Sequence, residues 1–177
     1  MRSGSRDKTK NLALCAMLCA LGVVILYLGA LIEVLDLSLA ALAPIFVIYV
    51  AIELGGYWPW LVYLVTGITA ILLLPQKFGA VIYLLFTGFY PMVKKWGEGK
   101  LPRFLALLVK LAVFHVSLVV AWLLIKLLMF PFSFTVAVYW AVAILEVTFL
   151  LYDFVLTRFI SLYIYRWRSK LRLGRKR

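Results

Sequence analysis

Seven ionisable side chains lie within apolar stretches of this sequence and are the first candidates for function. They are Glu53, Lys110, His115, Lys126, Glu146, Asp153 and Arg158. A charged side chain at the centre of a membrane costs about 2.5–3.5 kcal/mol on insertion scales, so such a residue faces a partner or a polar cavity. Glu53, Lys126 and Arg158 lie near the ends of their stretches, where a long stem can reach the interface. The other four residues are therefore the stronger candidates.

Lys110 and Asp153 are expected to form an intramembrane ion pair. If the last two helices pack antiparallel, both residues lie at a similar depth, several residues inside the same membrane face. His115 and Glu146 lie nearer the middle of their helices and should face a partner or a polar cavity. A lone histidine is more often a hydrogen-bonded core residue than a ligand, so both interpretations of His115 stay open.

An aromatic stripe is predicted in the fourth apolar stretch. Tyr83, Phe86 and Tyr90 are spaced i, i+3 and i+7, which places them on one face of a helix. Such a stripe either packs in a core or forms the wall of a ligand site. We include it in a candidate substrate pocket.

Polar residues supply the rest of this candidate pocket. Glu33, Asp36 and Lys77, together with Gln76, belong to predicted outer loops and could form a polar mouth for a zwitterionic solute. Exposed loop charges are usually only solvated, so the alternative is that these residues have no binding role. His115 and Glu146 complete the candidate pocket from within the membrane.

Enzyme motifs are missing from the sequence. It has no Gly-rich phosphate loop, no HExxH motif and a single histidine. Cys15 and Cys19 are four residues apart in an apolar run and are typical of small core residues on one helix face. We therefore expect no enzymatic activity, no cofactor and no metal site.

The elements that position these residues must be membrane helices. Hydrophobic residues make up 66% of the 177 residues, and the mean hydropathy is +1.06, whereas soluble domains are about 45–50% apolar. A membrane span needs about 20 mostly apolar residues, so six crossings would use nearly the whole chain. The apolar runs are Asn11 to Ile32, Leu39 to Leu54, Tyr57 to Leu74, Phe78 to Val93, Phe104 to Phe130 and Phe134 to Tyr163.

The basic residues predict how these helices are oriented. The formal net charge is +12, and 15 of the 19 Lys and Arg lie before residue 11, between Lys94 and Arg103, or after Tyr165. Short cytoplasmic loops carry such an excess of Lys and Arg, so both termini are expected in the cytoplasm and nucleic acid is not an expected partner. The prediction is an all-α integral membrane protein, a six-transmembrane-helix bundle of residues 11–165, with a basic cytoplasmic segment at 1–10 and a basic cytoplasmic tail at 166–177.

The first helix carries a motif of small residues. Ala13, Ala16 and Ala20 share one face, and the Ala16-xxx-Ala20 spacing lets another helix approach closely. Small residues are common in membrane spans, so a partner contact and internal packing are about equally expected.

The basic start and the segment Asn11-Leu-Ala-Leu-Cys-Ala-Met-Leu-Cys-Ala-Leu-Gly22 resemble the first helix of substrate-binding S components of energy-coupling factor (ECF) transporters. The chain length and six-helix layout are also similar to that family. The resemblance implies a multi-pass protein of the bacterial cytoplasmic membrane that binds an unidentified small solute. It also implies that Ala16 and Ala20 dock a transmembrane coupling subunit, while separate ATPase subunits supply the energy.

Two alternatives remain. A non-transporting membrane scaffold, similar to the small rod-shape protein of cell-wall elongation complexes, would need partner-binding faces and no cavity. An S component should instead enclose a cavity near the outer loops. An intramembrane enzyme would need two polar catalytic groups that face each other in a cavity.

Overall fold

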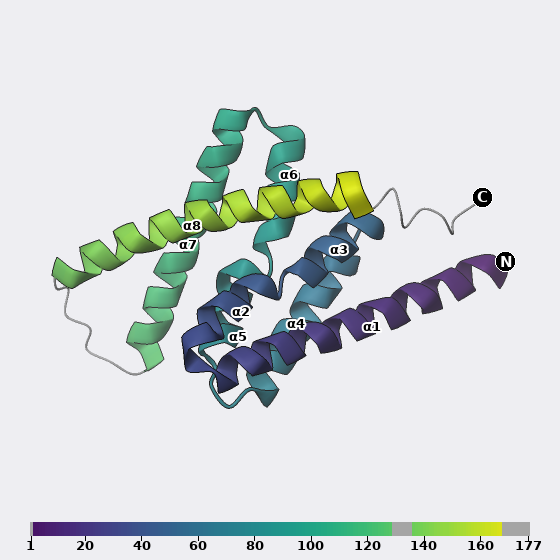
Figure 1. The fold of residues 1–177 in the computed structure, drawn as a ribbon, viewed down its shortest axis with the longest axis horizontal. Helices are drawn as coiled ribbons and strands as arrows, with labels where there is room; N and C mark the ends of the chain where they lie inside the picture. Colours follow the sequence, from purple (N-terminus) through teal and green to yellow (C-terminus); the bar gives the residue numbers. More distant parts are fainter. Residues whose placement is uncertain (1, 129–135, 168–177) are drawn as a thin grey trace. The chain divides into compact units, whose positions relative to one another are not determined.

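The computed structural model describes residues 2–128 and 136–167, and all regular elements in these ranges are helical (Figure 1). They form six helical segments, one for each predicted apolar run, so the predicted all-α fold of six helices is confirmed. Their elements are α1 (Arg2–Leu31), the 3-10 turn η1 (Glu33–Leu35), α2 (Asp36–Leu42), α3 (Ile45–Glu53), α4 (Trp58–Leu73), α5 (Phe78–Ile82), the π turn η2 (Tyr83–Thr87), α6 (Tyr90–Lys100), α7 (Arg103–Leu128), α8 (Val136–Leu162) and the π turn η3 (Tyr163–Trp167).

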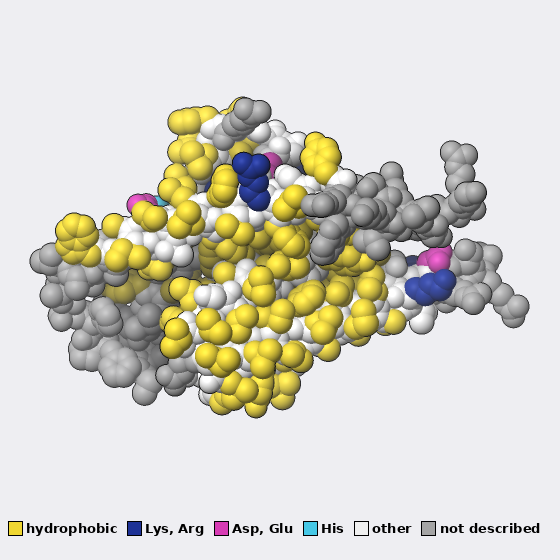
Figure 2. Space-filling model, in the orientation of Figure 1, with side chains coloured by type: hydrophobic (Ala, Val, Ile, Leu, Met, Phe, Trp, Pro, Cys, Tyr) yellow, Lys and Arg dark blue, Asp and Glu magenta, His cyan; other side chains and the backbone are white. Residues whose placement is uncertain are grey.

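Three stretches of the described residues are long and apolar enough to cross a membrane. They are Asp7–Leu31, Asp36–Glu53 and Phe104–Leu124, and Trp58–Leu73 is a shorter apolar helix. Large apolar side chains are exposed along them, among them Val24, Ile68 and Leu72, and Figure 2 shows many such side chains on the surface. Contact of these side chains with water is unfavourable, whereas contact with lipid is not, so the chain is a multi-pass membrane protein.

The chain divides into two units, Met1–Leu124 and Ile125–Arg177, and each is described by itself. The first unit contains α1 to α6 and most of α7, and the second contains α8 and η3. Most of the predicted basic tail, residues 168–177, lies outside the described residues.

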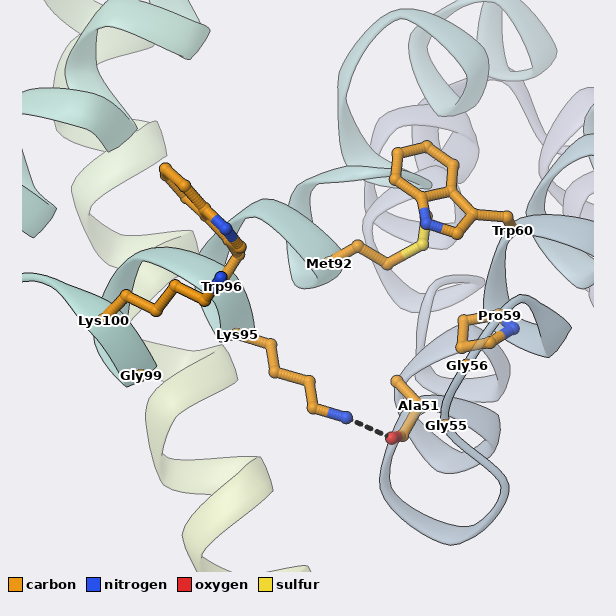
Figure 3. A pocket seen from close by; sticks show the side chains of 10 residues that line it. All are labelled: Ala51, Gly55, Gly56, Pro59, Trp60, Met92, Lys95, Trp96, Gly99 and Lys100. Carbon is orange, nitrogen blue, oxygen red and sulfur yellow. Dashed lines mark hydrogen bonds between the residues drawn. The ribbon is translucent and has the colours of Figure 1, made fainter.

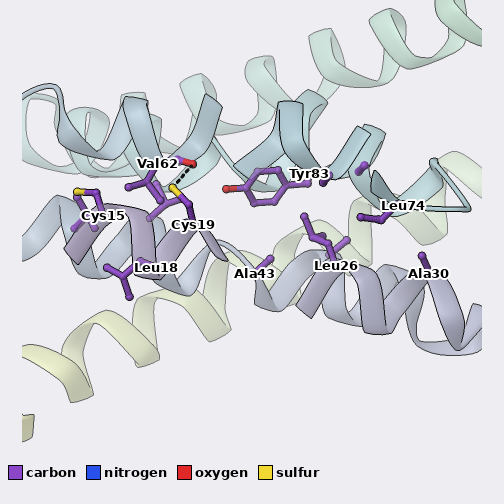
Figure 4. Close-up of a cluster of buried hydrophobic side chains, with 14 of the residues drawn as sticks. Cys15, Leu18, Cys19, Leu26, Ala30, Ala43, Val62, Leu74 and Tyr83 are labelled. Atoms are coloured by element: carbon purple, nitrogen blue, oxygen red, sulfur yellow. Dashed lines mark hydrogen bonds between the residues drawn. The ribbon is translucent and has the colours of Figure 1, made fainter. Parts of the chain in front are cut away.

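The core of the first unit lies where α1 packs against α4 and α2. Cys15, Leu18, Cys19 and Leu26 of α1 are buried there together with Val62 of α4 (Figure 4). The predicted role of the two cysteines as small core residues fits this position, and both thiols are free. The Cys19 thiol lies 3.7 Å from the Val62 carbonyl oxygen.

The second apolar run is interrupted once and begins earlier than predicted. The sequence predicts Asp36 in an outer loop, but Asp36 is the first residue of α2 and is buried. Pro44 lies between α2 and α3. Because proline has no backbone N–H, the series of helical backbone hydrogen bonds is interrupted there. The break lies in the middle of the 18-residue stretch Asp36–Glu53.

A π turn interrupts the fourth segment. The Gly88 N–H donates to the Tyr83 carbonyl, five residues earlier, at 2.8 Å. Such a turn rotates the residues after it relative to those before it. Pro91 then lies in the first turn of α6, where a missing N–H is harmless. Helix α6 continues to Lys100, so most of the predicted basic loop from Lys94 to Arg103 is helical.

Candidate functional site

The predicted partner face of α1 points away from the core of the first unit. Ala13, Ala16 and Ala20 are all exposed, whereas Cys15 and Cys19 on the other side of the helix are buried. A face that packed inside the first unit would be covered. The three alanines are therefore available to another helix or to lipid.

Asp36 lies in a tight cradle at the end of the first unit where α1, α2 and α5 meet. Its Oδ2 accepts a hydrogen bond from the Gly79 N–H at 3.1 Å, and its Oδ1 is buried with no hydrogen-bond partner among the described residues. A Cβ added at Gly79 would lie only 2.1 Å from Oδ1, and one at Gly29 would lie 3.2 Å from it. A side chain at position 79 would therefore clash with the carboxylate, and one at position 29 would be in tight contact with it.

The other residues of the predicted polar mouth lie around this cradle. Lys77 is exposed, and its ammonium donates to the Leu74 carbonyl at the end of α4. Glu33 lies in η1, and its side chain is outside the described residues. The structure thus brings Asp36 to the loop that contains Lys77, but as a buried packing contact instead of an open mouth.

The π turn divides the predicted aromatic stripe into two clusters. Tyr83 is buried against Tyr63 of α4, with ring centroids 5.9 Å apart. Phe86 instead packs against Tyr90 in a tilted arrangement, with ring centroids 5.1 Å apart, and meets Phe114 of α7 edge-on at 5.7 Å. The three residues therefore do not form one continuous wall.

The remaining predicted pocket residues lie elsewhere. His115 is exposed on α7, and its Nδ1 is 2.9 Å from the Leu111 carbonyl oxygen one turn earlier. Glu146 and Asp153 belong to α8 in the second unit. The Lys110–Asp153 ion pair would join the two units, so it stays a prediction.

A charge cluster that the sequence analysis missed lies on one side of α6. Glu98 Oε1 is 3.2 Å from the Lys94 ammonium and 2.5 Å from the Lys110 ammonium of α7. Lys94 is only 1% exposed. Its spacing of four residues from Glu98 is a signal for a helical ion pair, but the basic character of this segment predicts a loop for both residues.

The other side of α6 lines a pocket of about 390 Å³ (Figure 3). It opens beside the turn between α3 and α4, the end that the sequence predicts to be cytoplasmic. Gly55 and Gly56 make this turn with φ of +65° and +57°, values that disfavour other residues. The lining residues are Ala51, Gly55, Gly56, Pro59, Trp60, Met92, Lys95, Trp96, Gly99 and Lys100.

The pocket combines cations with aromatic rings. The Lys95 side chain extends across the pocket, and its ammonium donates a hydrogen bond to the Ala51 carbonyl at 2.5 Å (Figure 3). The Lys100 ammonium lies 5.8 Å from the centre of the Trp96 ring. None of the lining residues is acidic, and no group of three His, Cys, Asp or Glu suited to a metal ion occurs among the described residues. The arrangement can hold an anion that has an apolar part.

Comparison with known proteins identifies no relative. No family model, no curated protein and no solved structure matches the chain.

Proposed function

We propose that this chain is a membrane-embedded solute-binding subunit of an ECF-type uptake transporter, with six spans and both termini in the cytoplasm. The exposed small-residue face of α1 carries the proposal, because small side chains let a partner helix approach its backbone closely. The resemblance of this helix to the first helix of S components points to a coupling subunit as the partner. Separate ATPase subunits would supply the energy.

The charge distribution supports the orientation in this proposal. Lys8 and Lys10 precede the apolar part of α1, and Lys95 and Lys100 lie in the middle and at the end of α6. Both groups fall on the same side of the membrane if the segments between them cross it an even number of times. The positive-inside rule then places that side in the cytoplasm.

The docking assignment is tested by adding bulk to the α1 face. Ala16→Trp and Ala20→Trp should abolish co-purification with tagged coupling and ATPase subunits, because an indole holds the partner backbone away. Both sites are exposed, so insertion and thermal stability should stay unchanged. Ala112→Trp is the matched control, since Ala112 is exposed on α7. Full co-purification of both α1 variants would remove the docking assignment.

Solute binding needs its own test. The purified chain should co-purify with a small solute or be stabilised by one in a broad screen of vitamins and related compounds. If the screen finds no stabilising compound and no solute co-purifies, the solute-binding part of the proposal fails.

The packing around Asp36 favours a second candidate, a non-transporting membrane scaffold. The end of the first unit for which an open mouth is predicted holds a buried carboxylate between two glycines, at the first residue of α2. The pocket beside Gly55 lies instead after the C-terminal end of α3. A scaffold needs the α1 face but no emptied cavity. It would co-purify with cell-envelope proteins through Ala16 and Ala20 and bind no solute.

A further inference from the structure

We propose that the pocket between α6 and the α3–α4 turn binds a phosphate ester anion, which the membrane supplies as the headgroup of an anionic phospholipid. The pocket lies at the end of the candidate span Asp36–Glu53 and at the start of the apolar helix Trp58–Leu73. This is the depth at which a spanning helix meets lipid headgroups. The inference rests on the proposed orientation of the chain in the membrane and is independent of transport.

Charge is the first argument for an anionic ligand. Lys95 and Lys100 both line the pocket, no lining residue is acidic, and neither lysine pairs with a carboxylate in the described part of the chain. On the other side of α6, by contrast, Lys94 is paired with the carboxylate of Glu98. A basic pocket between helices on the cytoplasmic side is the typical site for an anionic headgroup.

The lysines are also held in suitable positions. The bond from Lys95 to the Ala51 carbonyl directs its ammonium across the pocket, and two of its three N–H donors stay available for an anion. The Trp96 ring lies close to the Lys100 ammonium. Each lysine offers an anion in the pocket a charge-assisted contact from a cation that is already positioned.

The shape and the apolar lining fit a lipid. A Cβ added at Gly55, Gly56 or Gly99 would meet no atom within 4 Å, so these residues leave the mouth open. Trp60 is 48% exposed and Trp96 is 52% exposed, and indole rings prefer the headgroup level of a bilayer. Met92 adds apolar surface between them. Glycerol and the first acyl carbons would contact these side chains while the phosphate meets the lysines.

Native mass spectrometry of the full chain in dodecyl maltoside tests the proposal. Titration should show tighter binding of phosphatidylglycerol than of phosphatidylcholine. In Lys95→Gln/Lys100→Gln the phosphatidylglycerol affinity should fall about fivefold for each lysine, or about 25-fold in all. Lys8→Gln/Lys10→Gln removes the same charge from exposed positions of α1 and should bind like the unchanged protein.

Further variants keep the test decisive if the double variant unfolds. Lys100→Gln leaves the bond to Ala51 intact and should still lose about fivefold, whereas Lys95→Arg/Lys100→Arg should retain binding. Glycerol 3-phosphate that competes with the lipid and depends on the same lysines would support the phosphate site and assign it to a soluble ester. Equal binding of phosphatidylcholine, or equal losses in both double variants, would overturn the proposal.

Discussion

Replacing Gly79 with alanine would place a methyl group directly against the Asp36 carboxylate. The added Cβ would lie 2.1 Å from Oδ1 and 3.1 Å from Cγ. Asp36 has little room to retreat towards α1, because a Cβ at Gly29 would already lie 3.3 Å from the Asp36 Cα. Either α5 must move away from α2 or the carboxylate must rotate out of its cradle.

Two effects of this substitution lower the free energy of unfolding, and one effect raises it. Overpacking in a close-packed interior typically costs about 1–3 kcal/mol, and the 3.1 Å bond from the Gly79 N–H to Oδ2 is weakened as well. Alanine regains about 1 kcal/mol over glycine in a helix. We therefore expect Gly79→Ala to lower the free energy of unfolding by about 2 kcal/mol.

Reversible unfolding in mixed detergent micelles, followed by circular dichroism, measures this loss. Gly97→Ala is the matched control, because Gly97 is also helical and a Cβ there would meet no atom within 4 Å; it should leave stability unchanged or raise it. In an Asp36→Ala background, Gly79→Ala should lose its penalty, since the clashing oxygen is gone. A Gly79→Ala variant as stable as Gly97→Ala, or a penalty that persists without Asp36, would refute the reasoning.

Two further predictions concern the π turn and the topology. Tyr63→Phe removes the hydrogen bond from the Tyr63 hydroxyl to the Leu84 carbonyl, 2.7 Å long in the structure, and should cost about 1 kcal/mol of unfolding free energy; an unchanged stability would show that this bond does not hold η2. For the topology, Gln76→Cys should react with a membrane-impermeant maleimide from outside intact cells, and Lys100→Cys should react only after the membrane is opened. Labelling of both cysteines from the same side would contradict the six-span orientation.

Local properties of the sequence were enough to predict the membrane class and the helical segments. Hydropathy and helix length depend only on neighbouring residues, so α4 (Trp58–Leu73) lies within one residue of the predicted run Tyr57 to Leu74 at each end. The burial of Cys15 and Cys19 also follows from such local patterns. The spacing of Ala16 and Ala20 does not predict whether Ala16 is exposed, because small residues serve internal packing as readily as partner contacts.

Contacts between distant segments decided the rest. The partner of Asp36 is Gly79, 43 residues later, and no pattern around Asp36 shows that its carboxylate would be buried instead of solvated. The same holds for the aromatic stripe, since i, i+3, i+7 spacing assumes an unbroken α-helix and the π turn at Tyr83 breaks that assumption.

The pocket shows the same division between sequence and tertiary structure. Sequence alone determined that glycines, tryptophans and lysines gather at the ends of the apolar runs, because these residue types are favoured in turns and at the membrane interface. Helix packing in three dimensions directs Lys95 towards the α3–α4 turn and Lys94 towards Glu98. Adjacent residues on a helix point about 100° apart, and the packing of α6 against its neighbours determines which lysine is buried in an ion pair and which lines a pocket.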